Sequence, residues 1–173
     1  MSVSLLSHIE HLGDGSGHAG AIFELVGHST FFAEFEREDI ELLSGYMQVY
    51  RAQPGQEILR EGEEGDFMLL LVAGNVEIFK QSAEAERQLM TSVGAGMTLG
   101  EMSMIDGEPR FATCIATDTV LFAVLTRDAL MGLILERPGL GTKLLIVLVT
   151  MLTQRLRQTS ARLLHYMERP LAF

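Results

Sequence analysis

The chain has 173 residues, of which 47% are apolar, and its formal net charge is −10 at pH 7. This length and apolar content suit one globular domain with a sizeable core. The negative charge repels the phosphates of a polynucleotide, and the single cysteine, Cys114, excludes an internal disulfide and any cysteine-rich metal site.

Residues 1–18 mix His, Gly and Ser without a steady periodicity, so we predict a flexible leader there. No basic segment precedes a long apolar one, and we therefore predict no secretory signal. His8, His11 and His18 could ligate a metal. A solvated chain end is the favoured interpretation because no carboxylate or cysteine cluster accompanies them, and we expect no metal and no cofactor.

Residues 19–137 form the predicted ligand-binding domain. Apolar residues between 19 and 45, such as Ile22 and Ile40, fit two short helices around a turn at His28–Thr30. From Met47 to Leu125, short β-prone runs alternate with glycine-containing turns. This spacing is typical of an antiparallel sandwich or roll.

The clearest predicted hairpin joins Phe67–Val72 to Val76–Phe79 through the turn Ala73-Gly74-Asn75. After Leu125 the period becomes helical again. A short helix is expected over Ala129–Leu135, and Pro138 ends it before a much longer helix.

The long helix could run to about Tyr166, on the order of 40 Å at about 1.5 Å per residue. Its most apolar stretch, Leu144–Leu152, is shorter than the roughly 20 residues that cross a bilayer, so we expect no membrane anchor. An apolar stripe continues along this helix at intervals of three or four residues: Leu145, Leu148, Leu152, Leu156, Thr159 and Leu163. Residues 138–173 are therefore interpreted as a dimerisation helix and tail that form a parallel homodimer, although packing within one chain produces such a stripe too.

The segment Leu99–Thr113 carries the predicted chemistry. Gly100 lets a backbone approach closely, and the following residues can form one helical turn, ended by Pro109, whose free N–H groups point at an anion. Arg110 offers a permanent guanidinium fork to a phosphate, while Glu101 can accept hydrogen bonds from sugar hydroxyls. The pair predicts recognition of a phosphorylated ribose; the alternative is a plain salt bridge across a surface loop.

These residues resemble the phosphate-binding cassette of the cyclic-nucleotide-binding domain family, which includes catabolite activator proteins and the regulatory subunits of cyclic-nucleotide-dependent kinases. The family pattern is aromatic-Gly-Glu-Leu-Ala-Leu, a short loop, then Pro-Arg-small-Ala. The matching positions are Gly100, Glu101, Pro109, Arg110 and Ala112.

The resemblance covers about residues 31–164 and implies a fold that is mainly β with flanking helices. Its centre would be a double-stranded β-helix, that is, a jelly-roll-like β-roll, followed by a long C-terminal dimerisation helix. It also implies that Glu101 binds the ribose 2′-OH and Arg110 the cyclic phosphate. The implied cassette residues are Gly100, Glu101, Met102, Ser103, Arg110, Phe111 and Ala112.

Phe111 departs from the family pattern, which more often has Ala, Ser or Thr after the arginine. The hydroxyl that helps to hold phosphate, or guanine in cGMP-selective members, is therefore missing, and cAMP is favoured over cGMP. Phe111 could instead close over the ligand, narrow the pocket or turn into the core.

The segment Gln154–Ser160 resembles the dimer helix of catabolite activator proteins, in which a Thr-Ser pair reaches the adenine. The resemblance implies that Thr159 bonds the base of its own subunit's ligand and that Ser160 bonds the ligand across the dimer. The alternative is a Thr159 that bonds back to the carbonyl four residues earlier. About ten residues follow Leu163, too few for the DNA-reading domain of those proteins, so no direct DNA binding is expected.

The sequence thus predicts a cytoplasmic sensor of a cyclic nucleotide, not an enzyme, whose ligand shifts a helix-paired homodimer and whose output goes to an unidentified effector protein. One alternative is a degenerate member of the fold that serves as a dimeric interaction module without nucleotide, for which Phe111 is the best support. Another is a transcription regulator whose DNA-binding partner is a separate chain. A cyclic dinucleotide as ligand also stays open.

Overall fold

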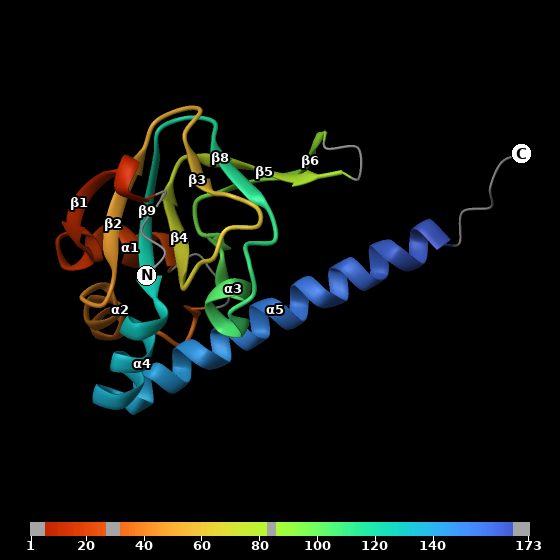
Figure 1. The fold of residues 1–173 in the computed structure, drawn as a ribbon. Coiled ribbons are helices and arrows are strands. Elements are labelled where there is room, and N and C mark those ends of the chain that lie inside the picture. The colour runs from red at the N-terminus through yellow and green to blue at the C-terminus, as the bar shows by residue number, and fades with distance from the viewer. Residues whose placement is uncertain (1–5, 27–31, 83–85, 168–173) are drawn as a thin grey trace, which may run out of the picture.

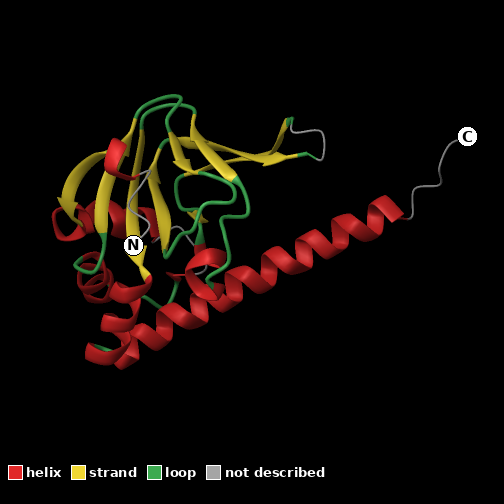
Figure 2. Cartoon of the chain, viewed as in Figure 1, coloured by secondary structure: helices red, strands yellow, loops and turns green. Residues whose placement is uncertain are grey.

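The computed structural model describes residues 6–26, 32–82 and 86–167. Two antiparallel sheets pack against each other, and helices cover the outer face of one of them (Figures 1 and 2). The first sheet has the order β1-β2-β9-β4-β7 and the second the order β3-β8-β5-β6. The expected β-roll with flanking helices and a long C-terminal helix is confirmed.

The strands are β1 (Glu10–Asp14), β2 (Gln48–Ala52), β3 (Glu57–Leu59), β4 (Phe67–Ala73), β5 (Asn75–Gln81), β6 (Arg87–Gly94), β7 (Thr98–Leu99), β8 (Thr113–Ala116) and β9 (Val120–Thr126). The helices are η1 (Leu6–His8), η2 (Gly15–His18), α1 (Ala19–Val26), α2 (Arg37–Ser44), α3 (Glu101–Asp106), α4 (Arg127–Glu136) and α5 (Pro138–Met167).

The expectation of a flexible leader is wrong for residues 6–18. Strand β1 pairs antiparallel with β2, and the amide of Gly15 donates to the carbonyl of Met47 at 2.9 Å. The register shifts between His11 and Gly13, and this irregularity breaks the two-residue alternation by which a strand is recognised in a sequence. Residues 1–5 lie outside the described residues.

The two predicted N-terminal helices correspond to α1 and α2, whereas the predicted turn at His28–Thr30 lies outside the described residues. Helix α2 begins with a capping box in which Glu36 and Asp39 each accept a hydrogen bond from the other's backbone N–H. Ile22 and Ile40 are buried beneath the first sheet. These helices thereby close the core on one side.

The predicted hairpin between Phe67–Val72 and Val76–Phe79 is wrong. Strand β4 pairs with β9 and β7, while β5 belongs to the other sheet, where it pairs with β8 and forms the true hairpin with β6. The amide of Asn75 donates to Asp118 Oδ1 at 2.8 Å, which anchors the crossing from one sheet to the other. A glycine-containing turn between two β-prone runs has the same sequence pattern whether the two strands form a hairpin or belong to different sheets.

Strand β4 is buried along both faces, as expected for a central strand with a continuous apolar run. Met68 and Leu70 pack toward the helices, and Leu69 and Leu71 pack between the sheets. Two core layers are thus built on alternate residues of one strand.

Helix α5 begins at Pro138, whose missing N–H leaves no helix hydrogen bond unmade in the first turn. Its first half packs against the domain through residues including Leu144 and Leu148, and its second half extends away from the β-roll (Figure 1). The helix has 30 residues, which corresponds to about 45 Å. It therefore reaches well beyond its own domain.

By length and composition, α5 could cross a membrane, because an 18-residue window within residues 138–165 has a mean hydropathy of 1.3. This window is longer than the nine-residue stretch Leu144–Leu152 on which the sequence argument was based. A share of 33% of it is buried inside the domain. Core helices of water-soluble proteins meet the same criteria, so this helix is weak support for a membrane span.

Candidate functional site

The predicted cassette runs from β7 of the first sheet through helix α3 to β8 of the second sheet (Figure 1). Gly100 precedes α3 with φ +79°, a left-handed conformation that glycine adopts without strain. A Cβ at position 100 would lie 2.6 Å from Arg110 Nη1, so the absence of a side chain also leaves room for the guanidinium group of Arg110. Helix α3 ends at Gly107, whose amide donates to Ser103 at 3.0 Å, and not at Pro109 as expected.

Arg110 is held deep in the wall of the pocket, with 4% of its surface exposed. Its Nη1 donates to the carbonyls of Phe67 at 2.7 Å and Gly100 at 2.9 Å, and its guanidinium carbon lies 4.2 Å from the Phe67 ring centroid. Burial lowers the pKa of Arg110, although arginine stays cationic in proteins. Nη2 is buried and has no hydrogen-bond partner within the described part of the chain.

Glu101, the first residue of α3, is 3% exposed. Its Oε1 is paired with Nη1 of Arg155, whereas Oε2 is buried and has no hydrogen-bond partner among the described residues. Burial raises the pKa of Glu101, and the positive charge of Arg155 opposes that rise. Glu101 and Arg110 form no ion pair with each other, so the surface salt bridge that the sequence left open is not what the structure contains.

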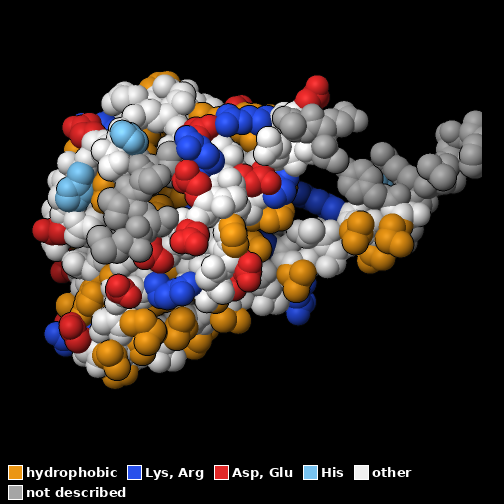
Figure 3. All heavy atoms as spheres, in the orientation of Figure 1, with side chains coloured by type: hydrophobic (Ala, Val, Ile, Leu, Met, Phe, Trp, Pro, Cys, Tyr) orange, Lys and Arg blue, Asp and Glu red, His pale blue; other side chains and the backbone are white. Residues whose placement is uncertain are grey.

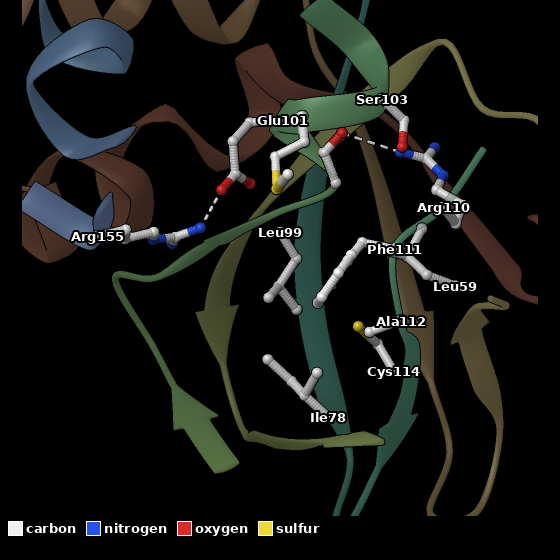
Figure 4. Close-up of a pocket in the computed structure, with 12 residues that line it drawn as sticks. Leu59, Ile78, Leu99, Glu101, Ser103, Arg110, Phe111, Ala112, Cys114 and Arg155 are labelled. Atoms are coloured by element: carbon white, nitrogen blue, oxygen red, sulfur yellow. Dashed lines mark hydrogen bonds and ion pairs between the residues drawn. The ribbon is translucent and has the colours of Figure 1, made fainter. Parts of the chain in front are cut away.

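Arg155 is a site residue that the sequence interpretation missed. It projects from α5 toward Glu101 (Figure 4), and its Nη2 also donates to the carbonyl of Thr98 at 2.8 Å. The signal that could have identified Arg155 is its position one helical turn before Thr159. This part of the helix was expected to approach the cassette, which contains the carboxylate of Glu101. A buried carboxylate calls for a cationic partner.

These groups line one pocket with about 520 Å³ of empty space, part of it open to solvent (Figure 4). Seven of the nine predicted site residues line it: Gly100, Glu101, Met102, Ser103, Arg110, Phe111 and Ala112. Arg155 and the apolar residues Leu59, Ile78, Leu99 and Cys114 complete the wall. Burial raises the pKa of the Cys114 thiol to about 12, so this sulfur is an apolar wall group and not a nucleophile.

Thr159 and Ser160 do not line this pocket. The hydroxyl of Thr159 donates to the carbonyl of Arg155 at 2.9 Å, which is the alternative that the sequence left open, and Ser160 is exposed on α5. Thr159 does line an adjoining groove of about 990 Å³ between α3, β6 and α5. Met102, Phe111 and Arg155 belong to the walls of both cavities, which are therefore neighbours.

Phe111 does not turn into the core, since 53% of its surface is exposed. Lys80 Nζ lies 4.4 Å from the centroid of its ring and donates to its carbonyl oxygen at 2.7 Å. The ring therefore stands at the boundary of the two cavities and leaves the Arg110 pocket open.

The three N-terminal histidines do not converge. His11 Nε2 lies 2.8 Å from Gln48 Oε1, and within residues 6–26, 32–82 and 86–167 no group of three or more His, Cys, Asp or Glu side chains could hold a metal.

A face of α5 stays apolar and exposed beyond the domain. Leu148 of the predicted stripe is 2% exposed and belongs to the chain's own core, while Leu156 is 67% exposed. The exposed apolar side chains are Leu145, Ile146, Val149, Leu156, Leu163, Leu164 and Met167. Figure 3 shows hydrophobic side chains gathered over α4 and the start of α5 and again toward the far end of α5. The predicted stripe is therefore divided between a core face and an exposed face.

The chain is a β-roll with a buried carboxylate oxygen and a buried guanidinium in the wall of one pocket, a combination suited to a ligand that carries both a hydroxyl and a phosphate. The chain belongs to the cyclic nucleotide-binding domain family, whose model matches residues 49–137.

Among solved structures, a cyclic nucleotide-binding domain from Methylobacillus flagellatus is 39% identical, with a TM-score of 0.85 over 97% of this chain and 94% of that one. The catabolite activator protein of Thermus thermophilus is 26% identical, with a TM-score of 0.69 over 78% of this chain and 62% of that one. A cAMP-activated global transcriptional regulator of Mycobacterium tuberculosis is 29% identical over 81% of this chain and 61% of its own length. The chain thus spans less than two thirds of that curated relative.

Proposed function

We propose that this chain is a regulatory module that binds cAMP in preference to cGMP and transmits binding through a homodimer paired along α5. The observation that carries this proposal is that Glu101 Oε2 and Arg110 Nη2, in the wall of one pocket, are both buried and have no hydrogen-bond partner among the described residues. One needs a donor and the other an acceptor. A ribose 2′-OH and a cyclic phosphate supply these two groups on one small molecule.

Within this proposal the cassette residues keep the roles that the family resemblance implies. Arg110 binds the phosphate and Glu101 the ribose hydroxyl, with the backbone around Gly100–Ser103 and Phe111–Ala112 supplying further donors. Arg155 holds Oε1 of Glu101 and so aims Oε2 at the ligand. The absence of a hydroxyl at Phe111 supports cAMP over cGMP.

The proposed homodimer is supported by the exposed apolar face of α5. Ile146, Val149, Leu156, Leu163 and Met167 are exposed and recur at spacings of three, seven, seven and four residues, which fits a heptad seam. Ser160 falls on the same seam, four residues after Leu156, and would face the partner helix. Thr159 would reach the base from the adjoining groove.

The proposed output is a change in the arrangement of the two α5 helices, read by an effector protein in the cytoplasm. Two of the three named relatives are a transcriptional regulator and a catabolite activator protein, and the formal net charge of −10 opposes contact of the chain with polynucleotides. The proposal includes no membrane contact, no cofactor and no catalysis. The domain division is a ligand-binding unit over 19–137 and a dimerisation unit over 138–173.

Calorimetry tests the proposal, with cAMP, cGMP and adenosine titrated into the wild type, Arg110→Ala and Glu101→Gln. We expect heat from cAMP with the wild type and little from adenosine, which lacks the phosphate. Arg110→Ala also removes buried hydrogen bonds, so Glu101→Gln serves as a second variant, because glutamine has nearly the same shape as glutamate. Glu41→Gln on the exposed face of α2 serves as the matched control.

Circular dichroism establishes that each variant is folded. Absence of heat from every cyclic nucleotide with the wild type would favour the alternative, a dimeric interaction module without nucleotide. Sedimentation tests the pairing separately, because Leu156→Glu should yield a folded monomer.

A further inference from the structure

Phe111 is an exposed aromatic ring on a backbone that is firmly held. The amide of Gly62 donates to the carbonyl of Arg110 at 2.9 Å, and the amide of Arg110 donates to the carbonyl of Glu63 at 2.8 Å. The backbone amide and the backbone carbonyl of Arg110, the residue before Phe111, are thus both held by hydrogen bonds. Exposing 53% of a phenylalanine at such a position forgoes the free energy of burial.

Lys80 holds the ring as well as the backbone. Its Nζ lies 4.4 Å from the ring centroid, donates to the Phe111 carbonyl at 2.7 Å and pairs with Glu61 Oε1 at 2.6 Å. Glu61 is itself fixed, because its Oε2 accepts from the amide of Gln81 at 2.9 Å. One face of the ring is therefore occupied by a cation, which leaves the opposite face for other contacts.

The groove beside the ring is mostly apolar, although Asp106 and Arg155 also line it. Its walls include Met90 of β6, Ile105 of α3 and Leu156 of α5, while the hydroxyl of Thr159 is engaged with the Arg155 carbonyl. Apart from Asp106, Arg155 and Thr159, the walls offer contact to the flat faces of a base and no hydrogen bonds to its edge. Phe111 also lines the Arg110 pocket, so a ligand anchored there by its phosphate could place its base in the groove.

We infer that Phe111 is the platform on which the base of the bound cyclic nucleotide stacks, using the ring face opposite Lys80. This inference rests on the proposed function and adds a specificity determinant to it. Stacking tolerates different bases but grows with the size of the ring system, so purine nucleotides should bind more tightly than pyrimidine nucleotides.

Binding of three probes separates stacking from phosphate recognition: cAMP, cCMP and ribose 3′,5′-cyclic phosphate, which has no base. Base stacking on an aromatic side chain is typically strong enough that Phe111→Ala should weaken cAMP binding on the order of tenfold to a hundredfold. Binding of the abasic probe should change less than about twofold. Phe111→Leu should resemble Phe111→Ala, and Phe111→Tyr should restore binding.

Leu89→Ala is the matched control, because Leu89 is an exposed apolar residue of β6 that lines neither cavity. A fluorescent 2-aminopurine cyclic nucleotide adds a direct readout, since stacking quenches its emission. Quenching should occur in the wild type and be lost in Phe111→Ala.

The outcomes separate a failure of the proposed function from a failure of the stacking role. If the wild type binds neither cAMP nor the abasic probe, the proposed function fails and the stacking role fails with it. If the wild type binds cAMP and Phe111→Ala binds it equally well with unchanged quenching, the stacking role is refuted and the proposed function stands. An equal loss for cAMP and for the abasic probe would also refute stacking, because it would place Phe111 in the phosphate site.

Discussion

Replacing Arg155 by methionine should destabilise the protein through Glu101. The substitution keeps the aliphatic length but removes the partner of a carboxylate that is 3% exposed. Breaking a buried ion pair by removing one partner typically costs about 3–5 kcal/mol. The Arg155 side chain is 35% exposed, so water replaces part of the lost attraction, and we expect a loss of about 1–3 kcal/mol at pH 7.

The cost should depend on pH in a defined direction. Burial raises the pKa of Glu101 above its ordinary value, so the ionised carboxylate destabilises the folded state relative to the unfolded chain. This penalty is absent below the ordinary pKa of glutamate and appears as the pH rises through the folded pKa. Without Arg155 the folded pKa rises further, so the difference in unfolding free energy between wild type and variant should widen from pH 4 to pH 7.

Urea unfolding at both pH values measures this difference. Arg157→Met on the exposed part of α5 is the control and should stay within about 0.5 kcal/mol of the wild type. In a Glu101→Gln background the buried charge is gone, so Arg155→Met should cost much less. An Arg155→Met cost that is equal at pH 4 and pH 7, and equal in both backgrounds, would show that Arg155 does not act through the Glu101 charge.

Three further predictions test the pocket and the helix. A Cβ at Gly65 would lie 2.1 Å from Arg110 Nε, so Gly65→Ala should displace the guanidinium and weaken cAMP binding at least about tenfold by calorimetry with an unchanged circular dichroism spectrum. Cys114, with a pKa of about 12, should react with iodoacetamide at pH 8 more than about a hundredfold faster in urea than in native buffer, as followed by mass spectrometry; equal rates would contradict its burial. Leu148→Ala should cost about 2–5 kcal/mol in urea unfolding, whereas Leu156→Ala should keep the fold and shift sedimentation toward the monomer.

Much of the cassette could be predicted because its residue types have few other uses in that order. A glycine before an acidic helix start, followed nine residues later by arginine, specifies a close backbone approach and two charges at a set separation. The structure places Glu101 and Arg110 in one pocket as the spacing indicated. The sequence did not indicate which groups these two side chains bind, because each partner lies far along the chain. Glu101 pairs with Arg155, and Arg110 donates to the carbonyl of Phe67.

The wrong predictions about the fold have the same physical origin. Local sequence indicates where β4 ends and β5 begins, but it does not indicate whether the next strand pairs with the last or joins another sheet. The alternation in β1 was hidden by a register shift of the chain between His11 and Gly13. Helix α5 was foreseen because its period persists over many turns, while the split of its leucines between core and exposed face depends on the docking angle.

Helix α5 connects three parts of the molecule by one rigid element. Leu148 fixes it to the core, Arg155 reaches the site and Leu156 presents the exposed face. Arg155 occupies Oε1 of Glu101, and Oε2 of the same carboxylate is the atom proposed to receive the ribose hydroxyl. A ligand on Oε2 need not displace Arg155. The proposed ligand would instead complete the hydrogen bonding of a buried carboxylate whose position depends on α5, and it should therefore bind more tightly to the helix arrangement that keeps this contact. That difference in affinity is what a nucleotide needs in order to shift a paired helix.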